Sequence, residues 1–508
     1  MSTAHSYLGV DIGTSLTKAA LFSGDGDLIG TAEQPTRLSH SAGGRVEQDL
    51  EDVVASVGAV VLATLEHLPA GAPSPALVAV TGQGDGCWLV DGDGRAVRPA
   101  VSWMDGRAGR ITTAWERDGV LERVFRANGN TLFPGSLAGV LAALDVEEPA
   151  VLHAAETAHT CVGVVFQRLT GVRATDPSDS SLPFGDPAQG DSAGGYSAGG
   201  YLAGGYLAVG YSAEVLEETG LTSRAPLLPP VVAPVPLAGL SAAGARLTGL
   251  AEGTPVSAGP FDLPACAIGA GLTEVGDGIL TVGTTLACQV LVDRIDTTGE
   301  PAGMHLATTE PGRWLRALPA MVGTASLDWV LDLVGLQHTA VGAVLRTTSA
   351  GAGGVEVLPY FAPSGERAPF VDAAARGQVT GLSLTTRGED VVRAVCEGIA
   401  FAGRDCFDRA GLTGQLFACG GGTRSHEWMQ LFADVLGRPV HLTRADGIGA
   451  RGAVLAHLRA TGVRAGAADW TDTSEVVEPD PALRGVYDEL FERYRAHRHA
   501  AQPLWRPV

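Results

Sequence analysis

The sequence predicts an α/β fold built from two similar lobes, and three features of the sequence support this prediction. Near the N-terminus, short apolar runs end in glycine turns, as buried strands do. A strand–turn–strand pattern at residues 10–16 recurs about 270 positions later, at residues 280–286. A strand, a glycine turn and the start of a helix follow one another over residues 416–436. A duplicated lobe, in which each half offers a Gly-Thr turn to a shared cleft, explains these features together; chance similarity between two short segments is the alternative.

The predicted elements of the first lobe are strands and one long helix. Apolar runs of strand length stand between turn residues, and a longer segment has helical spacing of its apolar residues. We expect strands over residues 7–12, 16–22, 28–32 and 77–81 and a helix over residues 50–67. In the second lobe we expect a strand over residues 416–418 and a helix over residues 426–436.

The boundary between the lobes is expected near residue 257, so that lobe one covers residues 1–257 and lobe two residues 258–508. The proline-rich segment 226–236 indicates an extended connection towards the end of lobe one. Lobe one also contains a low-complexity stretch, residues 190–211, in which tyrosine recurs every five residues. A period of five matches neither helix nor strand, so we expect a flexible surface insertion there; a tyrosine-lined binding arm is the alternative.

Composition and charge argue against several classes of partner. Hydrophobic residues make up 45% of the 508-residue chain and charged residues 18%, as in soluble globular proteins. The net charge of −21 argues against nucleic acid or an anionic membrane, because phosphate groups need clustered Lys and Arg. No apolar run approaches the ~20 residues that cross a bilayer, and residues 1–7 lack the features of a signal peptide. The seven cysteines contain no CxxC pair, so we expect reduced thiols, no zinc site and a cytoplasmic protein.

The first glycine turn is a candidate phosphate site. Asp11 ends the first predicted strand, and Gly13, Thr14 and Ser15 form the turn behind it. Glycine lets the backbone approach a phosphate, whose oxygens the turn N–H groups and the two hydroxyls can bind. Asp11 can hold Mg²⁺ directly or through water, and Lys18, the only lysine of the chain, can add a positive charge. An ordinary β-hairpin is the alternative.

Two further glycine turns offer similar chemistry in the second lobe. One follows the recurring strand, and the other stands between a strand and a helix, where it suits the base or the phosphates of a nucleotide. The candidate residues are Gly283, Thr284, Thr285, Gly420, Gly421, Gly422 and Ser425. For the later turn, a tight β–α connection with Ser425 as the helix N-cap is the alternative.

Asp262 is the candidate general base. It stands between Phe261 and Leu263 at the end of an apolar strand, where an ionised carboxylate is costly to bury without a purpose. Such a site can set the basicity and orientation of a carboxylate that takes a proton from a hydroxyl. The alternative is that Asp262 caps a helix that begins near Pro264.

Together, these motifs resemble those of the FGGY carbohydrate kinases, a family with the actin-like, RNase H-like two-lobe ATPase fold. The resemblance covers essentially the whole chain apart from the Tyr/Gly insertion. Residues 11–18 are similar to the family's first phosphate motif, residues 283–285 to its second, and residues 420–425 to its adenosine motif. Residues 377–397 are similar to its C-terminal signature, with Cys396 where an aliphatic or aromatic residue is usual.

The resemblance implies an enzyme that uses ATP and Mg²⁺ to phosphorylate a small neutral sugar or polyol. Asp262 falls where the family places its catalytic base, and residues 101–107 resemble the family's substrate-side Trp and Asp-x-Arg. The residues implied for acceptor binding are Gln83, Asp85, Trp103, Asp105 and Asp262. ATP and Mg²⁺ are expected mainly on lobe two and in the cleft, and a homodimer is one option for the assembly.

Within the family, residues 83–90 and 171–178 look most similar to erythritol kinases, and residues 259–262 to L-xylulose kinases. Glycerol kinases carry Arg-Glu where this chain has Gly84 and Asp85, and xylulokinases carry Met-His there. The resemblance therefore implies erythritol as the first acceptor, and L-xylulose, a related pentulose or a pentitol as the second.

Two departures from the family pattern affect the expected acceptor site. Leu263 replaces the amide that often follows the catalytic Asp, and residues 161–163 replace a polar pair. The alternative from another class is a non-catalytic actin-like scaffold or sugar sensor. A sensor that binds DNA would need a basic helix-turn-helix, which we do not find, and the retention of Asp11, Asp262 and the glycine turns favours the enzyme.

Overall fold

The computed structural model describes residues 5–185, 210–443, 447–463, 470 and 473–505. The chain forms two compact units. The first comprises Met1–Gly271, Asp293–Leu315 and Asp446–Trp470, and the second Leu272–Val292, Arg316–Ala445 and Thr471–Val508. The predicted insertion, residues 190–211, lies outside the described residues except for its last two positions.

The structure divides the chain less simply than into two consecutive halves. The expected boundary after residue 257 falls inside strand β11 (Pro255–Ala258), and the next helix, α10 (Asp262–Ala270), still belongs to the first unit. The chain later returns to this unit with helix α15 (Ile448–Ala460), which packs against α10 and strand β1. The assignment of one lobe to the acceptor and the other to the nucleotide stays a prediction.

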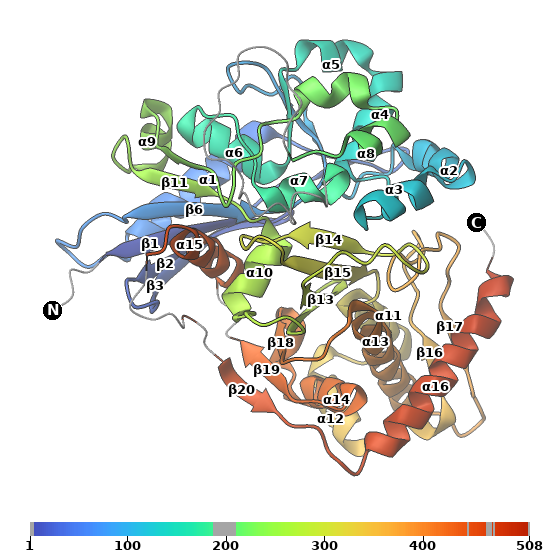
Figure 1. Ribbon diagram of the computed structural model, residues 1–508. Coiled ribbons are helices and arrows are strands. Elements are labelled where there is room, and N and C mark those ends of the chain that lie inside the picture. Colours follow the sequence, from blue (N-terminus) through green and yellow to red (C-terminus); the bar gives the residue numbers. More distant parts are fainter. Residues whose placement is uncertain (1–4, 186–209, 444–446, 464–469, 471–472, 506–508) are drawn as a thin grey trace. The chain divides into compact units, whose positions relative to one another are not determined.

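A six-stranded sheet in the order β10-β11-β6-β1-β2-β3 forms the centre of the first unit (Figure 1). Its other strands are β1 Ser6–Ile12, β2 Leu16–Ser23, β3 Leu28–Pro35, β6 Leu77–Gly82 and β10 Leu237–Gly239. β1 pairs antiparallel with β2 and parallel with β6, so Asp11 is in register with Lys18 on one side and Thr81 on the other. The four strands and the helix predicted for this region are confirmed, each to within a few residues.

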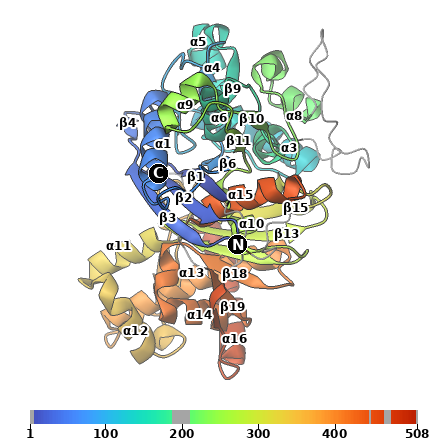
Figure 2. The ribbon, with the colours of Figure 1, turned by 90° about the vertical axis from the view of Figure 1, so that its left-hand side faces the viewer.

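Helices cover both faces of this sheet. One face carries α1 Leu50–Leu65, α6 Cys161–Thr170 and α9 Ala242–Thr248, and the other carries α10 and α15 (Figure 1). Figure 2 also shows α15 beside β1 and β2, although it comes from the far end of the sequence. Glycines allow α10 and α15 to pack closely, because a Cβ on Gly452 would lie 1.8 Å from the carbonyl oxygen of Ala265. This packing fixes α10, whose first residue is Asp262.

Smaller elements complete the first unit. They are β4 Ser39–Ser41, β5 Arg45–Gln48 and β8 Ala100–Val101 in one small sheet, β7 Trp88–Val90 and β9 Thr157–His159 in another, and β14 Met304–Ala307, which packs against α7. The helices are α2 Gly109–Arg117, α3 Val120–Asn128, α4 Leu137–Glu147, α5 Pro149–Ala154, α7 Pro177–Phe184 and α8 Ala213–Glu218. The segment expected to be extended, residues 226–236, begins with Pro226 inside a short 3-10 helix, Thr222–Leu227.

The second unit contains a sheet in the order β15-β13-β12-β18-β19-β20. Its elements are β12 Gly278–Val282, β13 Leu286–Val292, β15 Trp314–Ala320, β16 Glu356–Leu358, β17 Gln378–Thr380, β18 Leu416–Cys419, β19 Val440–Thr443, β20 Thr473–Val477, α11 Thr324–Val334, α12 Val341–Thr347, α13 Gly388–Ala410, α14 His426–Leu436 and α16 Arg484–Ala501. β12 pairs antiparallel with β13 and parallel with β18, as β1 does with β2 and β6. The repeated sequence pattern therefore corresponds to a repeated strand arrangement, and the strand and helix predicted near residue 420 are confirmed.

None of the helices in the described ranges has both the length and the apolar character needed to cross a membrane.

Candidate active site

Thr14, in the turn between β1 and β2, lies at the centre of a hydrogen-bond network. Its hydroxyl donates to Gln83 Oε1 at 3.1 Å and accepts from Trp103 Nε1 at 2.8 Å. Gln83 donates to Gln48 Oε1 at 2.8 Å, and Gln48 donates to the carbonyl of Thr14 at 3.1 Å. The network joins the predicted phosphate turn to two of the predicted acceptor residues. Gln48 was not predicted as a site residue. In the sequence it stands out only as an amide residue directly before Asp49, the N-cap of α1.

Asp105 is hydrogen-bonded through both of its carboxylate oxygens. Oδ1 accepts from the backbone N–H and the Nε of Arg107, both at 2.8 Å, while Oδ2 accepts from the N–H of Val46 at 2.6 Å and from Arg107 Nη2 at 2.9 Å. Burial raises the pKa of Asp105, but the hydrogen bonds from Arg107 and Val46 outweigh it and lower the pKa overall. A carboxylate offers about four lone-pair positions. Asp105 therefore fixes the segment that carries Trp103, and its direct contact with an acceptor stays a prediction.

Asp262 begins α10, and two hydrogen bonds fix the segment in front of it. Thr81 Oγ1 donates to the carbonyl of Pro260 at 2.7 Å, and the N–H of Phe261 donates to Ser178 Oγ at 3.1 Å. The cap position of α10 belongs to Phe261, so the structure does not show the alternative in which Asp262 is the N-cap. Its carboxyl group accepts a hydrogen bond from the backbone N–H of Leu263.

Two other carboxyl groups of the first unit, those of Asp11 and Asp85, act on the pKa of Asp262. Burial, followed by repulsion from Asp11, raises the pKa of Asp262 from 3.8 to about 7, with a smaller contribution from Asp85; a backbone hydrogen bond from Leu263 opposes the rise. Burial also raises the pKa of Asp11, and the charge of Lys18 opposes that rise. Proton transfer is most efficient when the pKa of the base is near the working pH. A pKa near 7 agrees with the predicted role of Asp262 as a general base, and that role stays a prediction.

Gly84 is packed against apolar side chains. A Cβ at this position would lie 2.7 Å from Cδ2 of Phe261 and 2.9 Å from Cδ1 of Leu182, which is closer than real Cβ contacts. The next residue, Asp85, has a φ of 54°, and its Oδ1 accepts from the N–H of Leu137 at 3.4 Å. The space beside Gly84 is therefore filled, and a side chain there would have to displace Phe261, the neighbour of Asp262.

We expect Gly84→Ala to lower stability by ~1–3 kcal/mol, the usual cost of overpacking, and to lower kcat because the displaced Phe261 adjoins Asp262. Denaturant unfolding and steady-state kinetics measure the two effects. Gly109→Ala is the matched control, since a Cβ there meets no atom within 4 Å. Equal stability and equal kcat in the two variants would show that the Phe261 side chain moves aside without a cost in free energy.

Asp11 lies against the first turn of α15. A Cβ on Gly449 would lie 2.4 Å from Asp11 Oδ2, so this helix can approach the carboxylate only with glycine at that position. Over the described part of the chain, no cluster of three or more His, Cys, Asp or Glu side chains is arranged to hold a metal. A single carboxylate fits Mg²⁺, which keeps several waters and binds nucleotide phosphates. Ser15 and Lys18, further along the same hairpin, are exposed.

The glycine turns predicted for the second unit lie side by side. A Cβ on Gly420 would lie 2.5 Å from the carbonyl oxygen of Val282, and one on Gly422 would lie 2.3 Å from its Cγ1. Val282 directly precedes Gly283, so the structure brings the second phosphate motif and the predicted adenosine motif together. Gly421, between the two packed glycines, has open space where a Cβ would stand.

The remaining residues of these turns have structural partners. The carbonyls of Gly283 and Thr284 accept from the first N–H groups of α11 at 2.9 and 3.3 Å, and the N–H of Gly283 donates to the carbonyl of Thr285 at 3.0 Å. Ser425 is the N-cap of α14 and accepts from the N–H of Trp428 at 3.3 Å, as the capping alternative predicted. The cap does not conflict with nucleotide binding at the glycines before it.

Comparisons with known proteins agree with this geometry. A model of the FGGY family of carbohydrate kinases, N-terminal domain, matches residues 6–183, and the model of the C-terminal domain matches residues 287–461. The chain is 32% identical over 524 residues to the erythritol kinase of Brucella abortus, with 98% of this chain and 96% of that protein covered. It is 28% identical to the xylulose kinase of Escherichia coli over 87% of each chain. The crystal structure of xylulose kinase from Rhodospirillum rubrum matches with a TM-score of 0.84 and 28% identity, covering 98% of this chain and 99% of that one.

Proposed function

Because the chain belongs to the FGGY family of carbohydrate kinases, with its actin-like ATPase fold, we propose that it transfers the γ-phosphate of ATP to a neutral polyol, with erythritol as the first candidate. The observation that carries the chemistry is Asp262, a carboxyl group with a pKa raised to about 7 beside two other carboxyl groups. Asp262 takes the proton of the acceptor hydroxyl as its oxygen attacks the γ-phosphorus, and the bond from phosphorus to the ADP oxygen breaks.

The glycine turns have the nucleotide roles in this proposal. Backbone N–H groups and hydroxyls of the two phosphate turns bind phosphate oxygens, and Lys18 adds a positive charge. The residues of these turns are Gly13, Thr14, Ser15, Gly283, Thr284 and Thr285. Gly420, Gly421, Gly422 and Ser425 face the adenosine. When bound, Mg²⁺ neutralises phosphate charge, and Asp11 is the residue that would hold it.

The acceptor assignment rests on the residues around Gly84. Gln83 and Asp85 offer an amide and a carboxylate that suit the hydroxyls of a short neutral chain, while a carboxylate repels an acidic sugar. Gly84 brings no cation, and its neighbours Phe261 and Leu182 leave no room for one. The similarity to an erythritol kinase over nearly the whole chain supports a four-carbon polyol. Similarity to xylulose kinases supports L-xylulose, a related pentulose or a pentitol as the second candidate.

An ADP-release assay across glycerol, erythritol, threitol, xylitol, D- and L-xylulose and gluconate tests the proposal. We expect the highest kcat/KM with erythritol, because a site built to bind a hydroxyl can reject an analogue that lacks it by up to ~10⁴–10⁵. The highest kcat/KM with glycerol or gluconate would contradict the acceptor assignment. No ADP release with any compound would instead favour a non-catalytic sensor or scaffold.

A further inference from the structure

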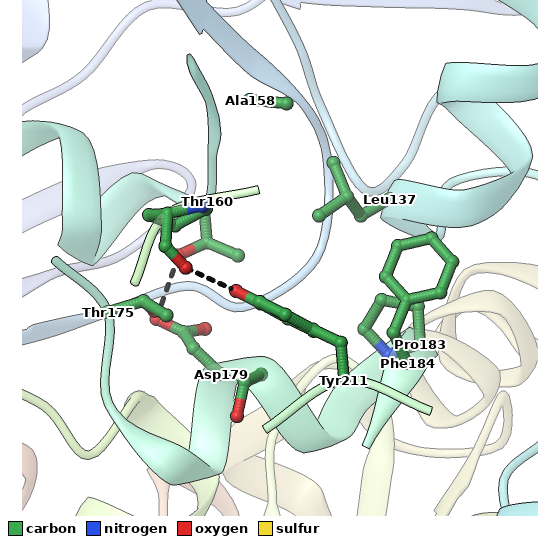
Figure 3. A pocket seen from close by; sticks show the side chains of 10 residues that line it. Leu137, Ala158, Thr160, Thr175, Asp179, Pro183, Phe184 and Tyr211 are labelled. Atoms are coloured by element: carbon green, nitrogen blue, oxygen red, sulfur yellow. Dashed lines mark hydrogen bonds between the residues drawn. The ribbon is translucent and has the colours of Figure 1, made fainter. Parts of the chain in front are cut away.

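The first unit contains a small cavity (Figure 3). It has about 10 Å³ for the centre of a water molecule, which is close to the room that one water needs. One of its walls is Leu137, whose N–H donates to Asp85 Oδ1 at 3.4 Å. The cavity is therefore next to the part of the unit that holds Asp85.

Asp179, on α7, is a buried polar group of this cavity. Its Oδ2 accepts from Thr160 Oγ1 at 2.8 Å, but its Oδ1 has no hydrogen-bond partner among the residues that the structure describes. Figure 3 shows the side chains of Thr160, Asp179 and Tyr211 turned towards the same space. The hydroxyl of Tyr211 already donates to the carbonyl of Pro229 at 3.0 Å. A buried polar atom without a partner is unfavourable. A ligand in the cavity that forms a hydrogen bond with Oδ1 would remove this cost.

The electrostatic surroundings connect Asp179 with the reacting groups. Burial, followed by the carboxyl of Asp176, raises the pKa of Asp179 well above its usual range, and Asp85 and Asp262 raise it further. The charges of Asp85 and Asp262 therefore act on Asp179, which connects this buried carboxyl group with the residues assigned to the acceptor and to the reaction. Because Oδ2 already accepts a hydrogen bond from Thr160, Oδ1 is the oxygen that remains for a hydrogen bond with a ligand.

We propose that Asp179 Oδ1 binds the hydroxyl at the end of the acceptor opposite the phosphorylated one, and that this hydroxyl displaces a water molecule from the cavity. The inference rests on the proposed function and adds a residue that selects acceptors by length. An acceptor with a methyl group in place of this hydroxyl displaces the water without replacing its hydrogen bond, and so leaves Oδ1 unpaired. The site should therefore discriminate against such an acceptor more strongly than lost contact area alone would.

The test compares erythritol with erythro-butane-1,2,3-triol, which lacks one terminal hydroxyl. In the natural enzyme we expect kcat/KM to be ~10- to 100-fold higher for erythritol. In Asp179→Ala the ratio should fall to within about threefold, mainly through a higher KM for erythritol. Ser180→Ala is the matched control, because Ser180 lines the same cavity but its hydroxyl donates to the carbonyl of Pro177; the ratio should stay as in the natural enzyme.

Three results would overturn the proposal. The first is a ratio of the two kcat/KM values near one in the natural enzyme. This result does not depend on whether any variant folds. The second is an equal loss of kcat/KM for both compounds in Asp179→Ala, as a purely structural role predicts. The third is a crystal structure with bound acceptor in which a water molecule still occupies Oδ1. If the natural enzyme prefers a pentulose, the erythritol assignment fails separately, and the same comparison is made with that pentulose and its analogue without the terminal hydroxyl.

Discussion

Replacing Asp262 with Asn is expected to lower kcat by ~10²–10⁴ while ATP binding stays near its natural value. Asn has the shape of Asp but cannot take a proton, so the variant loses the base without losing volume. Single-turnover kinetics and nucleotide titration measure the two properties. Asp118→Asn is the control, because Asp118 is exposed and pairs with Arg117 beside it on the chain. A kcat within threefold of the natural enzyme would remove Asp262 from the mechanism.

The pH dependence of the same variant provides an independent check. In the natural enzyme, kcat/KM should rise with pH through about 7, as Asp262 changes to its base form. Its pKa in the folded state lies above 3.8, so the folded protein binds more protons than the unfolded one, and stability falls as pH rises from about 4 to about 7. Asp262→Asn has no carboxyl group to ionise at this position, so it does not lose stability in this way as the pH rises. It should be the more stable protein at pH 8, by at most ~4 kcal/mol, and the difference should vanish below pH 4.

The sequence was sufficient to predict the strands of the repeated arrangement because their pattern is local. Residues 10–16 and 280–286 each show an apolar strand, a Gly-Thr turn and a second strand, and both pair in the same way with their neighbours. The division into units was not predictable in the same way. α15 joins the first unit through close packing of Gly452 on α10, a contact between residues almost 190 positions apart that leaves no periodic signal.

The candidate site shows the same contrast between local and distant relations. Residues with a motif around them, such as Asp11, Gly283 and Asp262, could be named in advance. Gln48 and Asp179 could not, because their importance comes from partners that the fold supplies: two hydrogen bonds to the Thr14 network for Gln48, and an unpaired oxygen in a cavity for Asp179.

Asp11→Asn is expected to lower kcat by ~10²–10³ at a fixed Mg²⁺ concentration and to shift the Mg²⁺ activation curve to higher concentrations. A neutral amide is a weaker ligand for Mg²⁺ than a carboxylate, whereas acceptor binding should change little. The fold should tolerate the change, because burial already disfavours the charged form of Asp11. Magnesium titrations of ADP release, at saturating acceptor, measure the shift.

The same substitution should also act on Asp262. Repulsion from Asp11 is the second largest cause of the raised pKa of Asp262. Removing that charge should therefore lower the pKa of Asp262 and move the acid limb of the kcat/KM profile to lower pH, a change that a merely structural Asp11 would not produce. Glu33→Gln is the control. Glu33 is exposed on β3, in register with Lys18 of β2, and this substitution removes a negative charge from the same sheet. Identical Mg²⁺ activation curves for Asp11→Asn and the natural enzyme would rule out a metal-binding role for Asp11, whatever happened to kcat.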